Sequence, residues 1–215
     1  MSVLELDAVQ VEAGGRALFE PVTARIAGGE VLSITGPSGS GKSSLLAFAC
    51  GILAPELAGH GDVRMDGRSL LGQPPERRRL GILFQDDLLF PHLSVGGNIG
   101  FGMRESPRRE RARLIDAALE SVGLAGFAAR DPATLSGGER ARVALLRVLL
   151  SEPRAVLLDE PFGRLDAPLR DAIRQLVFAR CRERGLPVVL VTHDAADVAA
   201  AGGRELPLQP VSHAR

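Results

Sequence analysis

The chain of 215 residues contains no tryptophan, no tyrosine and only two cysteines. The chain therefore has no indole or phenol ring that could stack on an aromatic ligand. Cys50 and Cys181 each lie in an apolar helical pattern, and neither has the spacing of a metal site. We therefore expect both cysteines to be buried, reduced thiols.

The sequence also lacks an excess of charge and a long apolar run. Its 26 basic and 26 acidic residues give a formal net charge of zero, so there is no electrostatic case for a nucleic-acid partner. The N-terminus has no basic region followed by an apolar core, so no signal peptide is predicted. No apolar run approaches the roughly 20 residues that a membrane helix needs. We therefore expect a cytosolic protein, or one that reaches a membrane only through a partner.

A glycine-rich segment is present, because GPSGSGKS at residues 36–43 matches the phosphate-binding pattern G-x-x-x-x-G-K-[ST]. An apolar run at residues 31–34 precedes it and helix-favouring residues 44–49 follow it, which is the strand–loop–helix setting that the motif requires. Its glycines let backbone N–H groups close around a phosphate chain. Lys42 is predicted to reach the β- and γ-phosphates, and Ser43 to ligate Mg²⁺. The predicted phosphate-binding residues are Gly36, Pro37, Ser38, Gly39, Ser40, Gly41, Lys42, Ser43 and Ser44.

The rest of the chain alternates between strand-like and helical patterns, which predicts a mostly parallel sheet with helices on its faces. Residues 3–35 are predicted to form strands and turns, and residues 51–61 an irregular connection. The basic cluster at residues 77–79 is expected to be a solvated face. Further helices are predicted over residues 107–122, 140–150 and 167–184.

Polar side chains follow three further apolar runs, at the points where the predicted strands end. They are Gln85, the pair Asp159 and Glu160, and His193. Ligands of open parallel sheets bind beyond the carboxyl ends of the strands, so these residues are expected to meet the phosphate-binding loop. Asp159 is predicted to hold Mg²⁺, and Glu160 to accept a proton from a water that attacks the γ-phosphate. The alternative is a pair of strand-end carboxylates without a catalytic role.

These motifs occur in the order seen in the ATP-binding cassette (ABC) ATPases, and the resemblance covers nearly the whole chain. LSGGE at residues 135–139 is very specific, because other P-loop classes lack Ser-Gly-Gly after a helical insertion. The other motifs are the phosphate-binding loop, Gln85, LLDEP at residues 157–161, Leu165-Asp166 and His193.

The resemblance implies roles for several residues. In the family, the Ser-Gly-Gly segment of one subunit closes over the ATP held by another, so that two ATP molecules lie between two head-to-tail subunits. In this chain the segment consists of Ser136, Gly137 and Gly138. Gln85 resembles the residue that contacts Mg²⁺ and the attacking water, and His193 the one that contacts the γ-phosphate. Asp166 resembles the aspartate that couples the two sites across the interface.

The resemblance also implies the architecture. It is an α/β P-loop NTPase (RecA-like) fold, with a mostly parallel sheet, an N-terminal antiparallel β subdomain and a small helical subdomain. A single nucleotide-binding domain is expected over residues 1–215, with its core at 1–85 and 136–215 and the helical subdomain at about 86–135. The protein would be the ATP-binding and ATP-hydrolysing subunit of an ABC transporter, a dimer that energises a separate transmembrane permease.

Residues 90–95, FPHLSV, resemble the importer segment that helps to form the groove for the permease. Within the family, the chain resembles the ATPase of the uncharacterised YnjBCD-type importers, a group related to the thiamine and iron importer ATPases. This implies an importer served by an extracytoplasmic solute-binding protein, with the ATPase at the cytoplasmic face of the inner membrane. One alternative is a soluble ABC-type ATPase that acts on nucleic acid or ribosomes, and another is a P-loop small-molecule kinase. The neutral charge, the single cassette and the short helical insertion argue against the first, and Ser-Gly-Gly against the second.

Three positions depart from the family pattern. The family usually places an aromatic side chain against adenine about two dozen residues before the loop, and by register Ala13 stands there. A lost stack is worth roughly 1–3 kcal/mol, so we expect weaker ATP binding or a relaxed base preference. Arg164 stands where a small residue is commoner, and an added interface contact is expected. Ser44 replaces the commoner threonine, with little expected effect.

Overall fold

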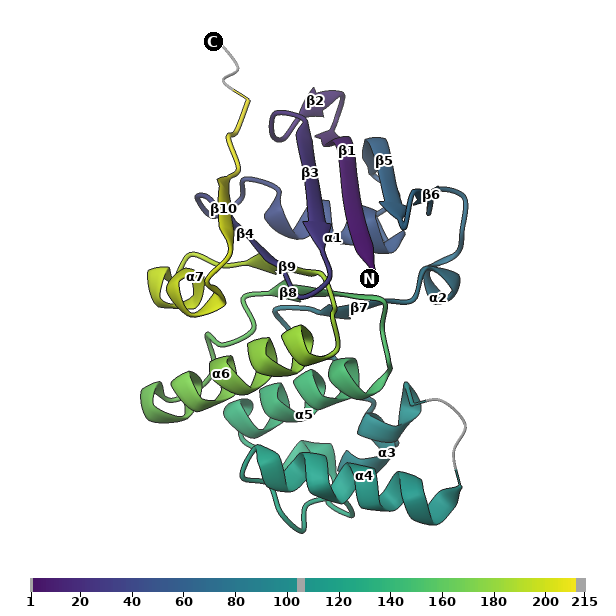
Figure 1. Ribbon diagram of the computed structural model, residues 1–215, viewed down its shortest axis with the longest axis vertical. Coiled ribbons are helices and arrows are strands. Elements are labelled where there is room, and N and C mark those ends of the chain that lie inside the picture. Colours follow the sequence, from purple (N-terminus) through teal and green to yellow (C-terminus); the bar gives the residue numbers. More distant parts are fainter. Residues whose placement is uncertain (1, 104–106, 212–215) are drawn as a thin grey trace.

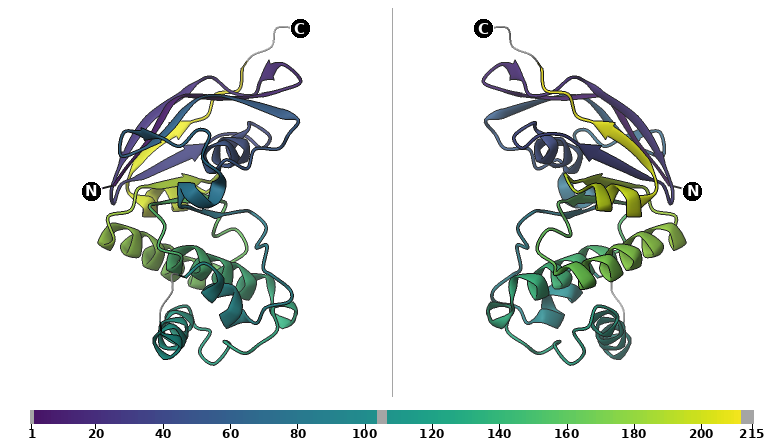
Figure 2. Two further views of the ribbon diagram at one scale, coloured as in Figure 1. Left: turned by 90° about the vertical axis from the view of Figure 1, so that its right-hand side faces the viewer. Right: turned by 90° about the vertical axis from the view of Figure 1, so that its left-hand side faces the viewer.

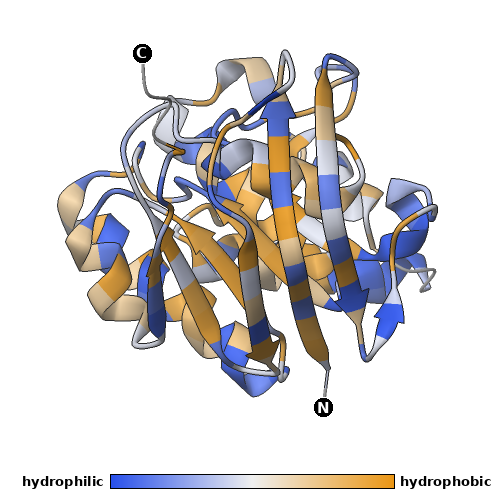
Figure 3. Cartoon of the chain, turned by 90° about the horizontal axis from the view of Figure 1, so that it is seen from above, coloured by the Kyte–Doolittle hydropathy of each residue, from blue (hydrophilic) through white to orange (hydrophobic). Residues whose placement is uncertain are grey.

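The computed structural model describes residues 2–103 and 107–211, and it contains two five-stranded sheets (Figure 1). The strands of the first sheet are β1 (Val3–Ala13), β2 (Arg16–Ala17), β3 (Val22–Ala27), β5 (Leu57–Met65) and β6 (Arg68–Ser69). They are antiparallel in the order β2-β1-β5-β6, and β3 also pairs with β1. Hydrophobic and hydrophilic residues alternate along these strands (Figure 3), as in sheets with one face toward solvent.

The second sheet is entirely parallel, in the order β10-β4-β9-β8-β7. Its strands are β4 (Val31–Thr35), β7 (Leu80–Leu83), β8 (Ala155–Asp159), β9 (Val188–Val191) and β10 (Arg204–Pro207). Every residue of β8 and β9 is buried. The predicted combination of a parallel sheet with an N-terminal antiparallel sheet is therefore confirmed.

Helices form the remaining layers (Figures 1 and 2). They are α1 (Lys42–Cys50), α2 (Pro75–Arg78), α3 (Val95–Phe101), α4 (Arg108–Ser121), α5 (Gly137–Leu150), α6 (Ala167–Glu183), α7 (Ala195–Ala201) and the 3₁₀ turn η1 (Pro132–Thr134). Helix α1 lies between the two sheets, whereas α5 and α6 cover the other face of the parallel sheet (Figure 2). Helices α3 and α4 pack on α5, away from both sheets. No helix in the described ranges has the length and apolar character needed to cross a membrane.

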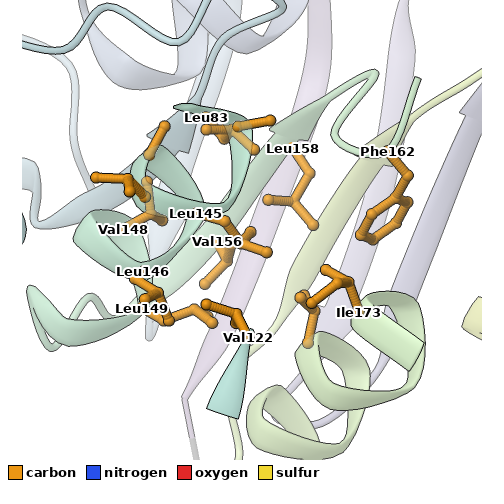
Figure 4. Packing of buried hydrophobic residues seen from close by; sticks show 14 of the residues in the cluster. Leu83, Val122, Leu145, Leu146, Val148, Leu149, Val156, Leu158, Phe162 and Ile173 are labelled. Carbon is orange, nitrogen blue, oxygen red and sulfur yellow. The ribbon is translucent and has the colours of Figure 1, made fainter. Parts of the chain in front are cut away.

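Two apolar clusters pack on opposite faces of the parallel sheet, and successive residues of β8 point into different clusters. Ala155 and Leu157 face α1 and the antiparallel sheet, whereas Val156 and Leu158 face α5 and α6 (Figure 4). Burial on both faces explains why these strands read as unbroken apolar runs. Cys50 and Cys181 are buried free thiols, as expected, and burial raises the pKa of the first to about 12 and of the second to about 11.

The predicted irregular connection over residues 51–61 is wrong in its second half, because β5 begins at Leu57. Two glycines of β5 favour a loop in the sequence pattern, but each has a different role within the strand. A Cβ at Gly59 would overlap the Phe48 ring. Gly61 has φ 87° opposite a register shift between Asp7 and Gln10, which is a β-bulge. The short polar edge strand β10 was not predicted either.

The solvated face predicted for residues 77–79 is also wrong at its centre, because Arg78 is 6% exposed. Its guanidinium donates hydrogen bonds to the carbonyl oxygens of Phe48 (3.0 Å), Ala49 (2.8 Å) and Gln73 (3.0 Å). The first two carbonyls belong to the last turn of α1, where carbonyl groups lack helical partners. Arg78 therefore closes the C-terminal end of the helix that begins in the phosphate-binding motif.

Candidate functional site

The glycine-rich loop connects β4 to α1 in a conformation that glycine alone adopts easily. Gly39 has φ 79° and Gly41 has φ 89°, both in the left-handed region. A Cβ at Gly41 would also lie 2.7 Å from the buried Phe19 ring. Gly41 is the N-cap of α1 and provides no side-chain cap, so the first N–H groups of the helix remain available to an anion.

Lys42 closes this loop from its inner side. The residue is 8% exposed, and its Nζ donates hydrogen bonds to the carbonyl oxygens of Gly36 (2.9 Å) and Pro37 (2.8 Å). These bonds hold the ammonium group at the mouth of the loop, where it can meet a phosphate chain. Ser40 lies in the same loop, and its buried hydroxyl oxygen has no hydrogen-bond partner among the described residues.

The predicted strand-end residues meet the loop in one pocket. It is lined by Leu18, Ser38, Gly39, Gly41, Lys42, Ser43, Ser44, Gln85, Asp159, Glu160 and His193. Gln85, Asp159, Glu160 and His193 follow neighbouring parallel strands, which explains how residues far apart in the sequence converge. The sequence did not predict Leu18 as a pocket residue, because two strands separate it from the motif and no sequence pattern connects it to the loop.

Asp159 is the last residue of β8 and lies deep in this pocket, 5% exposed. Burial raises the pKa of its carboxyl group, while a hydrogen bond with the Ser43 hydroxyl and the charge of Lys42 act in the opposite direction. The charge of Glu160 also raises this pKa. The carboxylate and the hydroxyl that the sequence predicted as Mg²⁺ ligands are therefore direct neighbours.

Glu160 has a left-handed backbone with φ 50°, which is uncommon outside glycine. Its N–H donates to the carbonyl oxygen of Val191 at 2.9 Å, which ties the end of β8 to the end of β9. Its Oε1 lies 2.7 Å from Nδ1 of His193, and this hydrogen bond raises the pKa of the histidine. The His193 side chain is 76% exposed, whereas that of Glu160 is 18% exposed, so the imidazole covers the carboxylate from the open side of the pocket.

A buried ion-pair network supports the segment that carries His193. Arg174 of α6 is 4% exposed, and its guanidinium pairs with Asp197 and with Asp194 (2.8 Å). Asp197 in turn accepts a hydrogen bond from the Thr192 hydroxyl at 2.7 Å. The network fixes the residues on both sides of His193. Sequence reasoning missed it, because its members come from separate elements without a common motif.

The predicted Ser-Gly-Gly segment and Asp166 do not line this pocket. Ser136 is the N-cap of α5, and its hydroxyl oxygen and Glu139 form a capping box, so the helix begins at Gly137 and not at residue 140 as predicted. A Cβ at Gly137 would have only the Arg140 guanidinium nearby, at 3.9 Å. Ala13, the predicted neighbour of adenine, is not among the lining residues either.

Comparison with known proteins identifies the family of the chain. The sequence profile described as "ABC transporter" matches residues 19–163. The chain belongs to the ABC transporter family. This makes it an ABC ATPase, the ATP-binding and ATP-hydrolysing subunit of an ABC transporter.

Three curated relatives of this ABC ATPase agree with the predicted subgroup. It is 47% identical to the uncharacterised ABC transporter ATP-binding protein YnjD of Escherichia coli K12, over 80% of each chain. It is 43% identical to the Fe(3+) ions import ATP-binding protein FbpC of Streptomyces coelicolor, over 94% of this chain but 58% of the relative. It is 42% identical to the thiamine import ATP-binding protein ThiQ of Vibrio parahaemolyticus, over 80% of this chain and 73% of the relative. The chain thus spans little more than half the length of the iron-import relative.

Solved structures confirm the fold of an ABC ATPase cassette. The dimeric structure of MJ0796, described as a bacterial ABC transporter cassette, matches with a TM-score of 0.82 at 31% identity, over 95% of this chain and 94% of that one. A dimeric post-hydrolysis state of the same cassette, bound to ADP and Pi, also has a TM-score of 0.82.

Proposed function

We propose that this ABC ATPase powers the import of a solute through a separate transmembrane permease. Two copies would bind head to tail with ATP at their interface, at the cytoplasmic face of the inner membrane, and an extracytoplasmic solute-binding protein would deliver the solute. Support for import comes from relatives that are named as import ATP-binding proteins for iron and thiamine.

The observation that carries the permease proposal is a groove immediately after Gln85. It is lined by Asp86, Asp87, Leu88, Leu89, Pro91, Pro132, Ala133, Arg140 and Arg164. Leu88 in the groove is 57% exposed. Phe101 of α3 is 65% exposed and packs against the ring of Phe90, which directly precedes the groove residue Pro91. Exposed apolar side chains next to a groove are typical of a protein-binding surface. This groove would receive the permease and transmit its state to Gln85.

The same proposal divides the chain into a core at residues 1–85 and 136–215 and a helical subdomain at about 86–135, within one nucleotide-binding domain over residues 1–215. Helices α3 and α4 belong to the second part. They lie away from both sheets and meet the core through α5, which supports the division.

Each pocket residue has a proposed role in hydrolysis. The loop N–H groups and Lys42 would hold the phosphates, Glu160 would accept the proton of the attacking water, and His193 would orient Glu160 and contact the γ-phosphate. In the second copy, Ser136, Gly137 and Gly138 would close over the γ-phosphate, and Asp166 would link the two sites.

We propose Ser43, Gln85 and Asp159 as the protein ligands of Mg²⁺. The hydrogen bond between the Ser43 hydroxyl and the Asp159 carboxylate brings two oxygen donors together, which fits a hard cation. No group of three or more His, Cys, Asp or Glu side chains that could hold a metal occurs in the described ranges. A site with one carboxylate agrees with a Mg²⁺ ion that is already bound to the phosphates of ATP. There the ion would neutralise the negative charge that develops during hydrolysis.

Affinity purification from detergent-solubilised native membranes tests the transport proposal. We expect a polytopic permease to be retained by the wild type and by Leu71→Asp, a control in which the side chain is 40% exposed and lies outside the groove. The Leu88→Asp variant should lose the permease, because it places a charge at the groove. Retention of nucleic acid or soluble proteins alone would exclude transport and favour a soluble ABC-type ATPase.

A further inference from the structure

Two loops that leave neighbouring strands of the parallel sheet are joined by ion pairs beside the ATP site. β7 and β8 pair in register, with Leu83 opposite Leu158. The loop after β7 begins with Phe84 and Gln85, and the loop after β8 begins with Glu160. Both loops therefore start from groups at the site and run outward from the same edge of the sheet.

Arg164 bridges these loops with one guanidinium group. It donates to Asp86 Oδ1 at 2.6 Å and to Asp87 Oδ2 at 3.0 Å, so two consecutive carboxylates bind the same side chain. These two ion pairs explain why an arginine stands at position 164, for which the sequence predicted an added interface contact. Within this chain its partners are the two residues that directly follow Gln85.

Asp87 extends the connection to α5. Its carboxyl group is buried, and Nε of Arg140 lies 3.7 Å from the same Oδ2 atom that Arg164 contacts. Arg147 donates to the main-chain oxygens of Asp87 (3.0 Å) and Leu88 (2.8 Å). Arg140 lies one turn beyond Ser136, so residues 86–88 are held both from the loop after β8 and from the helix that begins at Ser136.

We infer that Arg164 and Asp87 are positioning residues that hold Gln85 in the ATP site. When Arg164 is removed, Asp86 loses its partner and the Asp87 carboxylate keeps only its weaker contact with Arg140. The loop after β7 is then held from α5 alone, so it can move and carry Gln85 out of position. Lys42 and the glycine-rich loop have no contact with this cluster. Hydrolysis should therefore suffer while nucleotide binding is preserved.

The Arg164–Asp86 ion pair is expected to contribute little to folding, because the two side chains are 43% and 77% exposed. Asp87 is buried, but it keeps its contact with Arg140 when Arg164 is replaced. A matched control exists in Arg154, which is 35% exposed and donates to Asp66 at 2.6 Å on a different part of the surface. Both changes to alanine remove a partly exposed arginine, which contacts one aspartate in the case of Arg154 and two in the case of Arg164. Only Arg164 is connected to the ATP site.

The experiment measures kcat and KM for Mg-ATP hydrolysis by the isolated protein. We expect Arg164→Ala to lower kcat about tenfold with KM changed by less than about twofold, because small misplacements of a positioned group cost rate and not binding. Arg164→Lys should recover part of the rate, since a single ammonium group cannot contact both carboxylates in the same way. Asp86→Asn, at a side chain that is 77% exposed, provides a second variant that should fold and should also lower kcat.

A variant series in the Gln85→Ala background decides whether Arg164 acts through Gln85. If it does, Arg164→Ala causes no further loss of kcat there, because the group that it positions is already missing. The inference fails if kcat of Arg164→Ala equals that of Arg154→Ala, or if the loss is undiminished in the Gln85→Ala background. The inference rests on ATP hydrolysis and needs no permease, so its failure is distinct from failure of the transport proposal.

Discussion

The two parts of the proposed ATP site differ in how completely one chain assembles them. In the phosphate pocket the functional groups contact each other: Lys42 bonds to its own loop, Ser43 to Asp159, and Glu160 to His193. The hydrogen bonds of the Ser136 segment, in contrast, go to other residues of α5, namely the capping-box partner Glu139, the Arg140 N–H and the Arg142 guanidinium, and the segment lies outside that pocket. The first part is therefore preorganised for one nucleotide. The second part offers only the N–H groups at the start of α5. These groups can bind an anion only when another molecule brings one to them.

This difference implies that variants of the two parts should separate two measurements. Changes in the pocket should alter nucleotide binding or chemistry in a single copy. Changes at the Ser136 segment should leave binding by a single copy intact and affect only the step that requires a second copy. The following predictions test that separation.

The largest effect is expected for Glu160→Gln in the pocket. Loss of a general base lowers rates by about 10²- to 10⁴-fold, while the glutamine retains shape and a hydrogen bond toward His193. Steady-state ATP hydrolysis should nearly stop, and ATP binding should be retained in a trapped dimer that size-exclusion chromatography detects. Normal turnover would exclude Glu160 as the base.

Lys42→Ala should weaken nucleotide binding itself. A hydrogen bond to a charged group is worth about 1.5–3 kcal/mol, so we expect affinity for ATP to fall roughly 10- to 100-fold by calorimetry. Loss of the bonds to Gly36 and Pro37 could also loosen the loop. Circular dichroism and thermal unfolding are therefore recorded alongside. Unchanged affinity in a folded variant would contradict the proposed position of Lys42 against the phosphates.

Gly137→Asp tests the other part of the site. The added side chain meets open space within the chain, so folding should be preserved, but its charge would repel phosphates at the helix N-terminus. We expect ATP hydrolysis to fall by at least about tenfold, a smaller factor than for loss of the base. ATP binding by the monomer should change less than about twofold. Ala112→Asp, at an exposed position of α4, is the control for an added charge. Equal hydrolysis in both variants would remove the Ser136 segment from the site.

A structural feature could be predicted from the sequence where a local pattern of residues marks it. Asp159, Glu160 and His193 were placed correctly in the pocket, because buried parallel strands read as apolar runs and their ends are marked by the first polar residue. The glycines of β5 misled the same reasoning, since one makes room for Phe48 and another forms a bulge. In both cases the physical cause lies in a distant neighbour.

Charged residues showed the same limit. Arg78, Arg164 and Arg174 all have defined partners far away in the sequence. Ala49 lies 29 positions from Arg78, Asp87 lies 77 positions from Arg164, and Asp197 lies 23 positions from Arg174. A charge pattern along one sequence cannot distinguish such residues from a solvated face. The motifs therefore predicted groups that line the pocket but not the contacts of these three arginines.

A smaller effect is expected in the titration of His193. Its hydrogen bond to Glu160 raises its pKa above the ordinary 6.5, so protonated His193 is favoured in the folded state. The stabilisation is fully present below pH 6.5 and is lost as the pH rises through the raised pKa. NMR titration, with His193→Gln used to assign the signal, should find a pKa above 6.5 that returns toward 6.5 in Glu160→Gln. An unchanged pKa in that variant would mean that the two side chains are not paired in solution.

The smallest effect is expected in the choice of base, because the proposed contacts of the pocket are with the phosphates. Of the described residues that line it, His193 alone has a ring and Leu18 alone has an apolar side chain. We expect affinities for ATP and GTP that differ by less than about fivefold, or about 1 kcal/mol, since no tyrosine or tryptophan exists to stack on adenine. Leu18→Ala should weaken both nucleotides equally if its contact is not specific for the base. Strict preference for ATP would show that another residue reads adenine, and it would make the pocket as selective for the base as it is for phosphate.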